Sequence, residues 1–198
     1  MKKVLVAFIS ISSSLFSTVV LAELNYDAIS LSRGKVSRSG YPDMTAYIYR
    51  ISKSLFDNVY IGMEYEKDVQ PSGTTLALDV GFHAPLKDNT DLVFKGGLMN
   101  GSSELTGVSE SSNGYQLSAG IRTELTPQFV GEFSCGYSNI NSGSSTTSNK
   151  TTSLGLNVSM GYRITPKFEL IAEIDSSTTR QAPIYSTRLV GIGAKINY

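Results

Sequence analysis

Apolar and polar residues alternate strictly along this chain in segments about ten residues long, and no other feature constrains its fold as strongly. Successive side chains of a β-strand point to opposite faces, so strict alternation predicts strands with one apolar and one polar face. In the clearest segment, Thr152–Tyr162, the residues on the apolar face are Leu154, Leu156, Val158, Met160 and Tyr162.

Ten such segments predict ten strands. They are Asn25–Lys35, Thr45–Ser54, Val59–Glu66, Thr74–Ala84, Asp91–Met99, Gly114–Glu124, Gln128–Ser138, Thr152–Tyr162, Lys167–Ser176 and Thr187–Tyr198. The pattern is weakest in the first segment. Demoting it and another weak segment gives an eight-stranded alternative.

Short and long connections alternate along the chain. The short ones are tight turns of Asp-Asn or Thr-Pro chemistry at Leu55–Asn58, Leu86–Asn89, Leu125–Gln128 and Ile164–Lys167. The long ones are polar and rich in glycine or serine, near Val36–Met44, Lys67–Gly73, Asn100–Asn113, Asn139–Lys150 and Ser177–Ser186. Short turns at one end and long loops at the other are typical of transmembrane barrels in the bacterial outer membrane. Both termini are then expected at the short-turn end.

The two strand faces differ in charge. The apolar face carries no charge in the middle of a strand, and its exceptions, Asp27 and Arg188, lie near strand ends. The other face carries Arg50, Glu64, Glu66, Asp79, His83, Lys95, Arg122, Glu124, Glu132, Arg163, Glu169, Glu173, Asp175 and Lys195. A soluble barrel would bury the apolar face, but Tyr and Phe cluster near strand ends here, as in the interfacial girdles of membrane barrels. We therefore predict an all-β, antiparallel, up-and-down transmembrane barrel with a polar lumen.

Charges inside a narrow lumen are expected to be paired. Counted outward from the short turns, Arg50 matches Glu64, Arg122 matches Glu132, and Arg163 matches Glu169. The pair formed by Asp79 and Lys95 is nearly matched. These four pairs are predicted to be cross-strand ion pairs.

The first 22 residues are predicted to be a cleaved signal peptide rather than a membrane anchor. Lys2 and Lys3 precede the apolar stretch Val4–Leu21, and Val20-Leu21-Ala22 precedes the expected cut before Glu23. Residues 23–198 then form one barrel domain. The single cysteine, Cys135, excludes an internal disulfide and is best explained as a small apolar residue on a strand.

The last strand ends in Val190-x-Ile192-x-Ala194-x-Ile196-x-Tyr198. A terminal aromatic residue preceded by apolar residues at every second position resembles the signal by which outer-membrane barrels are recognised for insertion. With its Asp-Asn and Thr-Pro turns, the mature chain is similar to the small porin-like outer-membrane β-barrel family of Gram-negative bacteria, although phenylalanine is the usual last residue there. The resemblance implies insertion into the outer membrane by the barrel assembly machinery through the strand that ends at Tyr198.

Catalytic, cofactor-binding and metal-binding residues are not predicted. His83 is the only histidine, and Asp79 lies about 13 Å away if both are on one strand, beyond hydrogen-bond reach. Glu173 and Asp175 are more simply explained by a salt-bridged lumen than by a cation site. The 17 basic and 17 acidic residues balance, which argues against nucleic-acid binding.

Three functions remain open. A barrel of about ten strands is nearly filled by side chains, which favours a non-enzymatic protein whose polar loops contact a host or surface ligand, or support envelope integrity. A narrow channel for ions or small solutes is the alternative, and a lipid-modifying enzyme using His83 is the second. The expected lipid partner is lipopolysaccharide, with phosphates near Arg33, Lys35, Arg38 and Tyr41, although a solvated loop explains these four residues equally well.

Overall fold

The computed structural model describes residues 24–40, 42–69, 72–105, 108–143, 148–180 and 186–198. This part of the chain forms ten strands: β1 (Ala28–Arg38), β2 (Met44–Phe56), β3 (Val59–Asp68), β4 (Gly73–Lys87), β5 (Thr90–Leu105), β6 (Val108–Thr126), β7 (Phe129–Gly143), β8 (Ser148–Thr165), β9 (Phe168–Thr179) and β10 (Ser186–Asn197). No helix in these residues is long and apolar enough to cross a membrane. The predicted signal peptide, residues 1–22, lies outside the described residues.

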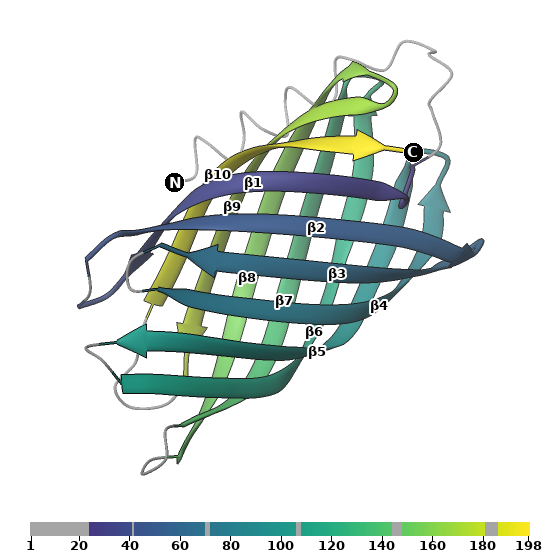
Figure 1. Cartoon of the computed structure of the whole chain (residues 1–198). Coiled ribbons are helices and arrows are strands. Elements are labelled where there is room, and N and C mark those ends of the chain that lie inside the picture. Colours follow the sequence, from purple (N-terminus) through teal and green to yellow (C-terminus); the bar gives the residue numbers. More distant parts are fainter. Residues whose placement is uncertain (1–23, 41, 70–71, 106–107, 144–147, 181–185) are drawn as a thin grey trace, which may run out of the picture.

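The strands form one closed antiparallel barrel. Each strand pairs with the next along the chain, and β1 closes the ring by pairing with β10, from Ala28 opposite Asn197 to Arg38 opposite Thr187. Figure 1 shows β10 lying beside β1 at this closure. The predicted ten-stranded, up-and-down barrel is confirmed, and the first predicted segment is a full member of it.

The four short turns lie at one end of the barrel, which we call the turn end, and the opposite end is the loop end. A register shift precedes each of these turns, as between Ser54 and Phe56 and between Arg163 and Thr165. The threonine of each Thr-Pro turn stabilises the reversal: Thr126 Oγ1 accepts the Phe129 N–H at 3.1 Å, and Thr165 Oγ1 accepts the Phe168 N–H at 3.0 Å. The turn chemistry predicted from the sequence therefore marks the turns correctly.

Two of the predicted long loops are largely strand. β5 and β6 remain paired from Asn100 opposite Asn113 to Leu105 opposite Val108, and β7 and β8 from Asn139 opposite Thr152 to Gly143 opposite Ser148. These segments are rich in Ser, Thr and Asn and lack apolar alternation, but backbone pairing needs no apolar side chain. We call residues 100–105, 108–113, 139–143 and 148–152 the polar hairpins.

The predicted faces are confirmed. Large apolar side chains point outward along every strand, and Leu98 and Ile192 are each 71% exposed, whereas Glu124 is 0% exposed. Cys135 also faces outward. A water-soluble protein does not leave so much contiguous apolar surface uncovered while burying its charges. The outer surface is therefore built to contact lipid.

Candidate functional site: the barrel lumen

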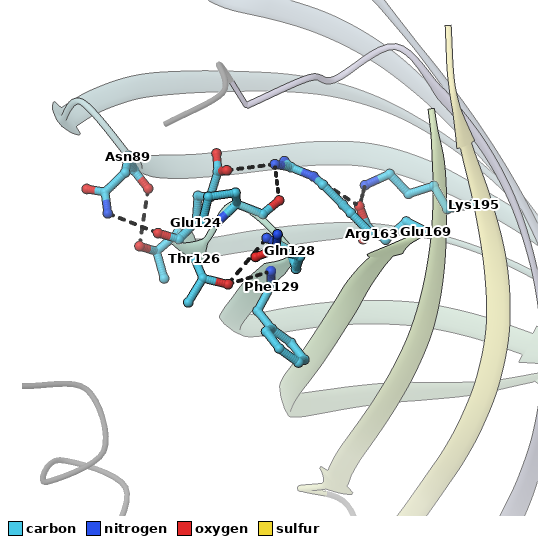
Figure 2. A network of polar contacts seen from close by, with 10 residues as sticks. Asn89, Glu124, Thr126, Gln128, Phe129, Arg163, Glu169 and Lys195 are labelled. Carbon is cyan, nitrogen blue, oxygen red and sulfur yellow. Dashed lines mark hydrogen bonds and ion pairs between the residues drawn. The ribbon is translucent and has the colours of Figure 1, made fainter. Parts of the chain in front are cut away.

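In the turn-end half of the lumen, an ion-pair network joins β6, β8, β9 and β10 (Figure 2). Arg163 Nη1 lies 2.8 Å from Glu124 Oε1, and Arg163 Nε lies 3.9 Å from Glu169 Oε2. Lys195 Nζ is 3.4 Å from the same Glu169 oxygen. The Asn89 amide donates to the Glu124 backbone carbonyl at 2.9 Å, which ties the network to the β4–β5 turn.

A glycine makes room for this network. An added Cβ at Gly161 would lie 1.8 Å from Glu169 Oε1. Because Glu169 is itself bonded to two cations, it cannot swing away without breaking an ion pair. Gly161 on β8 is therefore part of the network although it contributes no polar side-chain atom.

Arg50 links strands on both sides of the barrel closure. Its Nε lies 2.6 Å from Glu64 Oε2 on β3, and its Nη1 lies 2.9 Å from Glu173 Oε2 on β9. The second contact passes over β1 and β10, whose inward positions at this level include Ser32 and Gly191. Small residues on the intervening strands let one guanidinium reach a partner three strands away.

The same arrangement recurs on the other side of the lumen. Lys95 on β5 reaches over β6 to Glu132 on β7, with Nζ 3.2 Å from Oε1. Gln116 on β6 reaches over β5 and donates to Asp79 Oδ1 on β4 at 3.0 Å. The position crossed on β5 is Gly97, where a Cβ would lie 2.0 Å from the same Asp79 oxygen.

Two of the four predicted ion pairs are confirmed. Arg50 with Glu64 and Arg163 with Glu169 are opposite in register and within salt-bridge distance. The other two predictions were wrong. Glu132 is opposite Arg122 in register but bonds to Lys95, and Asp79 bonds to Gln116 rather than to Lys95. The predictions considered only adjacent strands, whereas the long side chains reach over small residues to the next strand.

A residue that precedes β1 forms the floor of the lumen. Tyr26 is 6% exposed, and its hydroxyl donates to Asp91 Oδ2 at 2.7 Å. The Tyr26 ring stacks on His83, with ring centroids 4.0 Å apart. Arg122 on β6 lies over the same ring, with its Cζ 4.8 Å from the ring centroid. The Tyr60 ring also stacks on Tyr26, with ring centroids 5.0 Å apart. Sequence reasoning missed this role of Tyr26, because the alternation is weak in the predicted segment Asn25–Lys35 that contains it.

The carboxylate next to His83 is therefore Asp91 and not Asp79, which the sequence analysis considered. His83 Nδ1 lies 3.2 Å from Asp91 Oδ2, on the neighbouring strand, and the His83 ring packs on Tyr26. Glu173 bonds to Arg50, and Asp175 accepts a hydrogen bond from the Asn157 amide at 2.7 Å. Among the described residues, no group of three or more His, Cys, Asp or Glu is placed to hold a metal ion.

A cavity of about 860 Å³ runs along the lumen from the loop end down to Tyr26, and Glu169 and Lys195 of the turn-end network also line it. One wall is apolar and consists of the buried residues Val36, Met44, Ala46, Ile48 and Leu189 on β1, β2 and β10. The facing strands contribute hydroxyl groups, among them those of Ser138, Ser153 and Thr179. The apolar wall was not predicted, because the polar face was identified by its charges alone.

Two ion pairs lie at the rims of the outer surface. At the turn end, Asp27 pairs with Lys53 and accepts the Ser54 backbone N–H at 2.6 Å, and these contacts lower its pKa to about 2. At the loop end, Lys35 Nζ lies 2.6 Å from Asp43 Oδ2. The Lys35 ammonium and the Ser37 hydroxyl lower the pKa of Asp43 below its usual value. Asp27 and Arg188 lie near strand ends, as predicted, but Arg33 faces outward in the middle of β1, so the prediction of no mid-strand charge on this face was wrong there.

Comparison with known proteins agrees with this architecture. The family model of the outer membrane protein beta-barrel domain matches residues 46–160. No curated protein matches the chain in sequence.

Similar solved structures show the fold alone, because their sequence identities are low. The outer membrane protease OmpT from Escherichia coli is 10% identical, with a TM-score of 0.57 and coverage of 92% of this chain and 99% of that chain. The N-terminal β-barrel domain of OprF from Pseudomonas aeruginosa is 13% identical, with a TM-score of 0.41 and coverage of 88% and 100%. The NanC porin is 11% identical, with a TM-score of 0.48 and coverage of 85% and 100%. The family match spans more than half of a chain that forms a closed, lipid-facing barrel, so this protein belongs to the outer membrane β-barrel family and resides in the outer membrane.

Proposed function

We propose that this protein is a non-enzymatic surface protein whose closed barrel presents the polar hairpins for adhesion or for contacts within the envelope. The observation that carries the proposal is the opposite character of the two barrel ends. The turn end is packed with ion pairs, while strands β5 to β8 continue at the loop end as polar hairpins. In outer-membrane barrels the short turns face the periplasm, which directs the polar hairpins to the cell exterior.

The ion pairs and the buried Tyr26 ring at the turn end support a scaffold rather than a passage. Tyr26 lines the lower end of the cavity, and its hydroxyl is bonded to Asp91. Glu124 and Arg163 are paired at the same end. A solute would have to break these contacts in a low-dielectric interior, where an unpaired charge is costly.

Current measurements in planar bilayers test this part of the proposal. The refolded wild-type protein is expected to give no stepwise current. The variant Tyr26→Gly, which removes the floor ring, is expected to give small steps and so shows that insertion is detected. Stepwise current from the wild type would overturn the proposal.

A hairpin replacement tests the display role. Residues 102–111 and 141–150 are each replaced by Asn-Gly, a sequence suited to a two-residue hairpin turn. The new turns join Gly101 to Ser112 and Ile140 to Thr151, which are already opposite in register. Cells producing this variant are expected to lose attachment to epithelial cells and to abiotic surfaces, while its heat-modifiable gel migration stays that of a folded barrel. Unchanged attachment to both surfaces would contradict the display role.

A narrow channel is the second candidate, and the continuous cavity of about 860 Å³ favours it. Carboxylates outnumber basic groups among the described inward side chains, so such a channel would prefer cations. If the wild type conducts, the reversal potential in a salt gradient shows this preference.

A lipid-modifying enzyme is less well supported. His83, Asp91 and Tyr26 contact one another at the turn end, away from the outer leaflet. Lipid A mass spectra of cells producing wild type or His83→Ala are expected to be identical. A change that depends on His83 would favour the enzyme.

A further inference from the structure

The outward face of the barrel carries basic residues at the loop end that contact no acidic partner. Arg33 on β1, Lys67 on β3 and Arg188 on β10 are exposed, and their side chains make no ion pair within the described residues. We call these three residues the basic arc. Lys35 lies beside them on β1 but is already paired with Asp43.

The basic arc follows the upper border of the lipid-facing surface. Along β1 the last outward apolar residue is Leu31 and the next outward residue is Arg33. Lys67 follows Tyr65 in the same way on β3. On β10, which runs in the opposite direction, Arg188 precedes Val190. Each cation therefore occupies the first position beyond the apolar band.

Register brings the arc together around tyrosines. Arg33 and Lys67 are both opposite Tyr47 of β2, which places their backbones about 10 Å apart, twice the strand spacing. Arg188 is opposite Ser37 of β1, and Ser37 is the next outward residue after Lys35 toward the loop end. Tyr49 and Tyr65 lie just below with ring centroids 6.0 Å apart. Tyrosines next to cations are the composition of a membrane interface.

The opposite side of the barrel has a neutral border. The first outward residue beyond the apolar band is Asn113 on β6, Asn139 on β7, and Thr152 on β8. Lys150 and Arg180 also face outward, but further from the apolar band. Among the described residues, charge at the loop-end border of the apolar band is thus confined to β10, β1 and β3, so it does not reflect a general excess of cations at this end.

We propose that the basic arc binds the phosphate groups of lipopolysaccharide in the outer leaflet. Cations on a lipid-facing surface are tolerated where headgroups can pair with them, and guanidinium groups bind phosphate oxygens in a bidentate manner. Arg38, considered together with Arg33 in the sequence, lies on the inward-facing side of β1 and does not belong to the arc. Tyr41 lies outside the described residues.

Binding of lipid A to the full-length barrel in detergent micelles tests the proposal. The test variant is Arg33→Gln/Lys67→Gln/Arg188→Gln. The control variant, Lys87→Gln/Lys150→Gln/Arg180→Gln, removes the same charge elsewhere. Each cation at an anionic membrane surface contributes about a factor of five, so the test variant is expected to bind bisphosphorylated lipid A about a hundred-fold more weakly than wild type. The control variant is expected to bind like the wild type.

Three further arms make the result decisive. Lipid A without phosphates is expected to bind the wild type as weakly as bisphosphorylated lipid A binds the test variant. Free inorganic phosphate at the same concentration is expected not to displace lipid A, because the arc extends over several strands. The conservative variant Arg33→Lys/Lys67→Arg/Arg188→Lys is expected to restore most of the binding and to migrate on gels as a folded barrel. Two results would overturn the proposal. One is that wild type and test variant bind bisphosphorylated lipid A equally well, and the other is that the wild type binds phosphate-free and bisphosphorylated lipid A equally well.

Discussion

The two halves of the lumen are built from the same ten strands but stabilised in different ways. In the turn-end half, buried charges such as Glu124, Arg163 and Glu169 are joined into one network. In the loop-end half, an apolar wall that includes Ile48 and Leu189 faces hydroxyl groups across a cavity. Strand pairing alone therefore does not dictate how a small barrel fills its interior. The inward residues on each half-strand decide whether the lumen there is crossed by ion pairs or lined by apolar and hydroxyl groups.

The largest expected effect comes from removing the cation at the centre of the turn-end network. Arg163→Leu leaves Glu124 and Glu169 without this partner, and they are 0% and 3% exposed. Breaking one side of a buried ion pair costs about 3–5 kcal/mol of unfolding free energy. Urea unfolding in detergent, followed by far-ultraviolet circular dichroism, measures it. Arg180→Leu, an exposed change just beyond β9, is expected to cost at most about 0.5 kcal/mol. Equal midpoints for the two variants would show that the network does not stabilise the barrel.

A pair of glycines on one strand sharpens the comparison between the halves. Gly161→Ala places a Cβ 1.8 Å from Glu169 Oε1 in the turn-end half. Gly155→Ala, nearer the loop end on β8, meets no atom closer than 3.5 Å. We expect the first change to lower the unfolding free energy by about 1–3 kcal/mol, because overpacking displaces a bonded side chain. The second change should leave it unaltered within about 0.5 kcal/mol. If Gly155→Ala costs as much as Gly161→Ala, the loop-end half is as tightly packed as the other.

The smallest expected effect lies outside the lumen, at the turn-end rim. The pKa of Asp27 is about 2 in the folded protein, below its usual value of 3.8. A lowered pKa means that the contribution of Asp27 to stability is present above its usual pKa and is lost as the pH falls through about 2. Asp27→Asn should therefore cost about 0.5 kcal/mol at pH 6, as expected for an exposed ion pair, and much less at pH 2.

The partner residue provides the check on this assignment. Lys53→Gln should cause the same loss at pH 6, and the double variant should lose no more than either single variant. A difference between wild type and Asp27→Asn that stays constant from pH 6 to pH 2 would contradict the ion pair.

The sequence predicts the number and facing of the strands well, because alternation directly reports which side chains share a face. It predicts the interior less well. Arg50 with Glu64 is found because the two are neighbours across one turn, but Arg50 with Glu173 depends on small residues of β1 and β10 in between. Tyr26 closes the floor from within the segment where the alternation is weakest, ahead of β1. The polar hairpins were expected as loops because hydrogen-bonded backbone leaves no hydrophobic pattern to detect.

The closure between β1 and β10 also determines the order in which contacts form. Nine of the ten strand pairings join neighbours along the chain, whereas this one joins its two ends, where the Tyr198 N–H donates to the Asp27 carbonyl at 3.2 Å. Local hairpins lose little chain entropy when they form, but a pairing between distant segments loses more and gains its contacts late. Until β1 and β10 pair, both edge strands expose unpaired backbone N–H and C=O groups to the hydrocarbon interior of the membrane, which offers them no hydrogen bonds. Folding of this protein is therefore expected to pass through an open sheet whose two edge strands need protection until β1 pairs with β10.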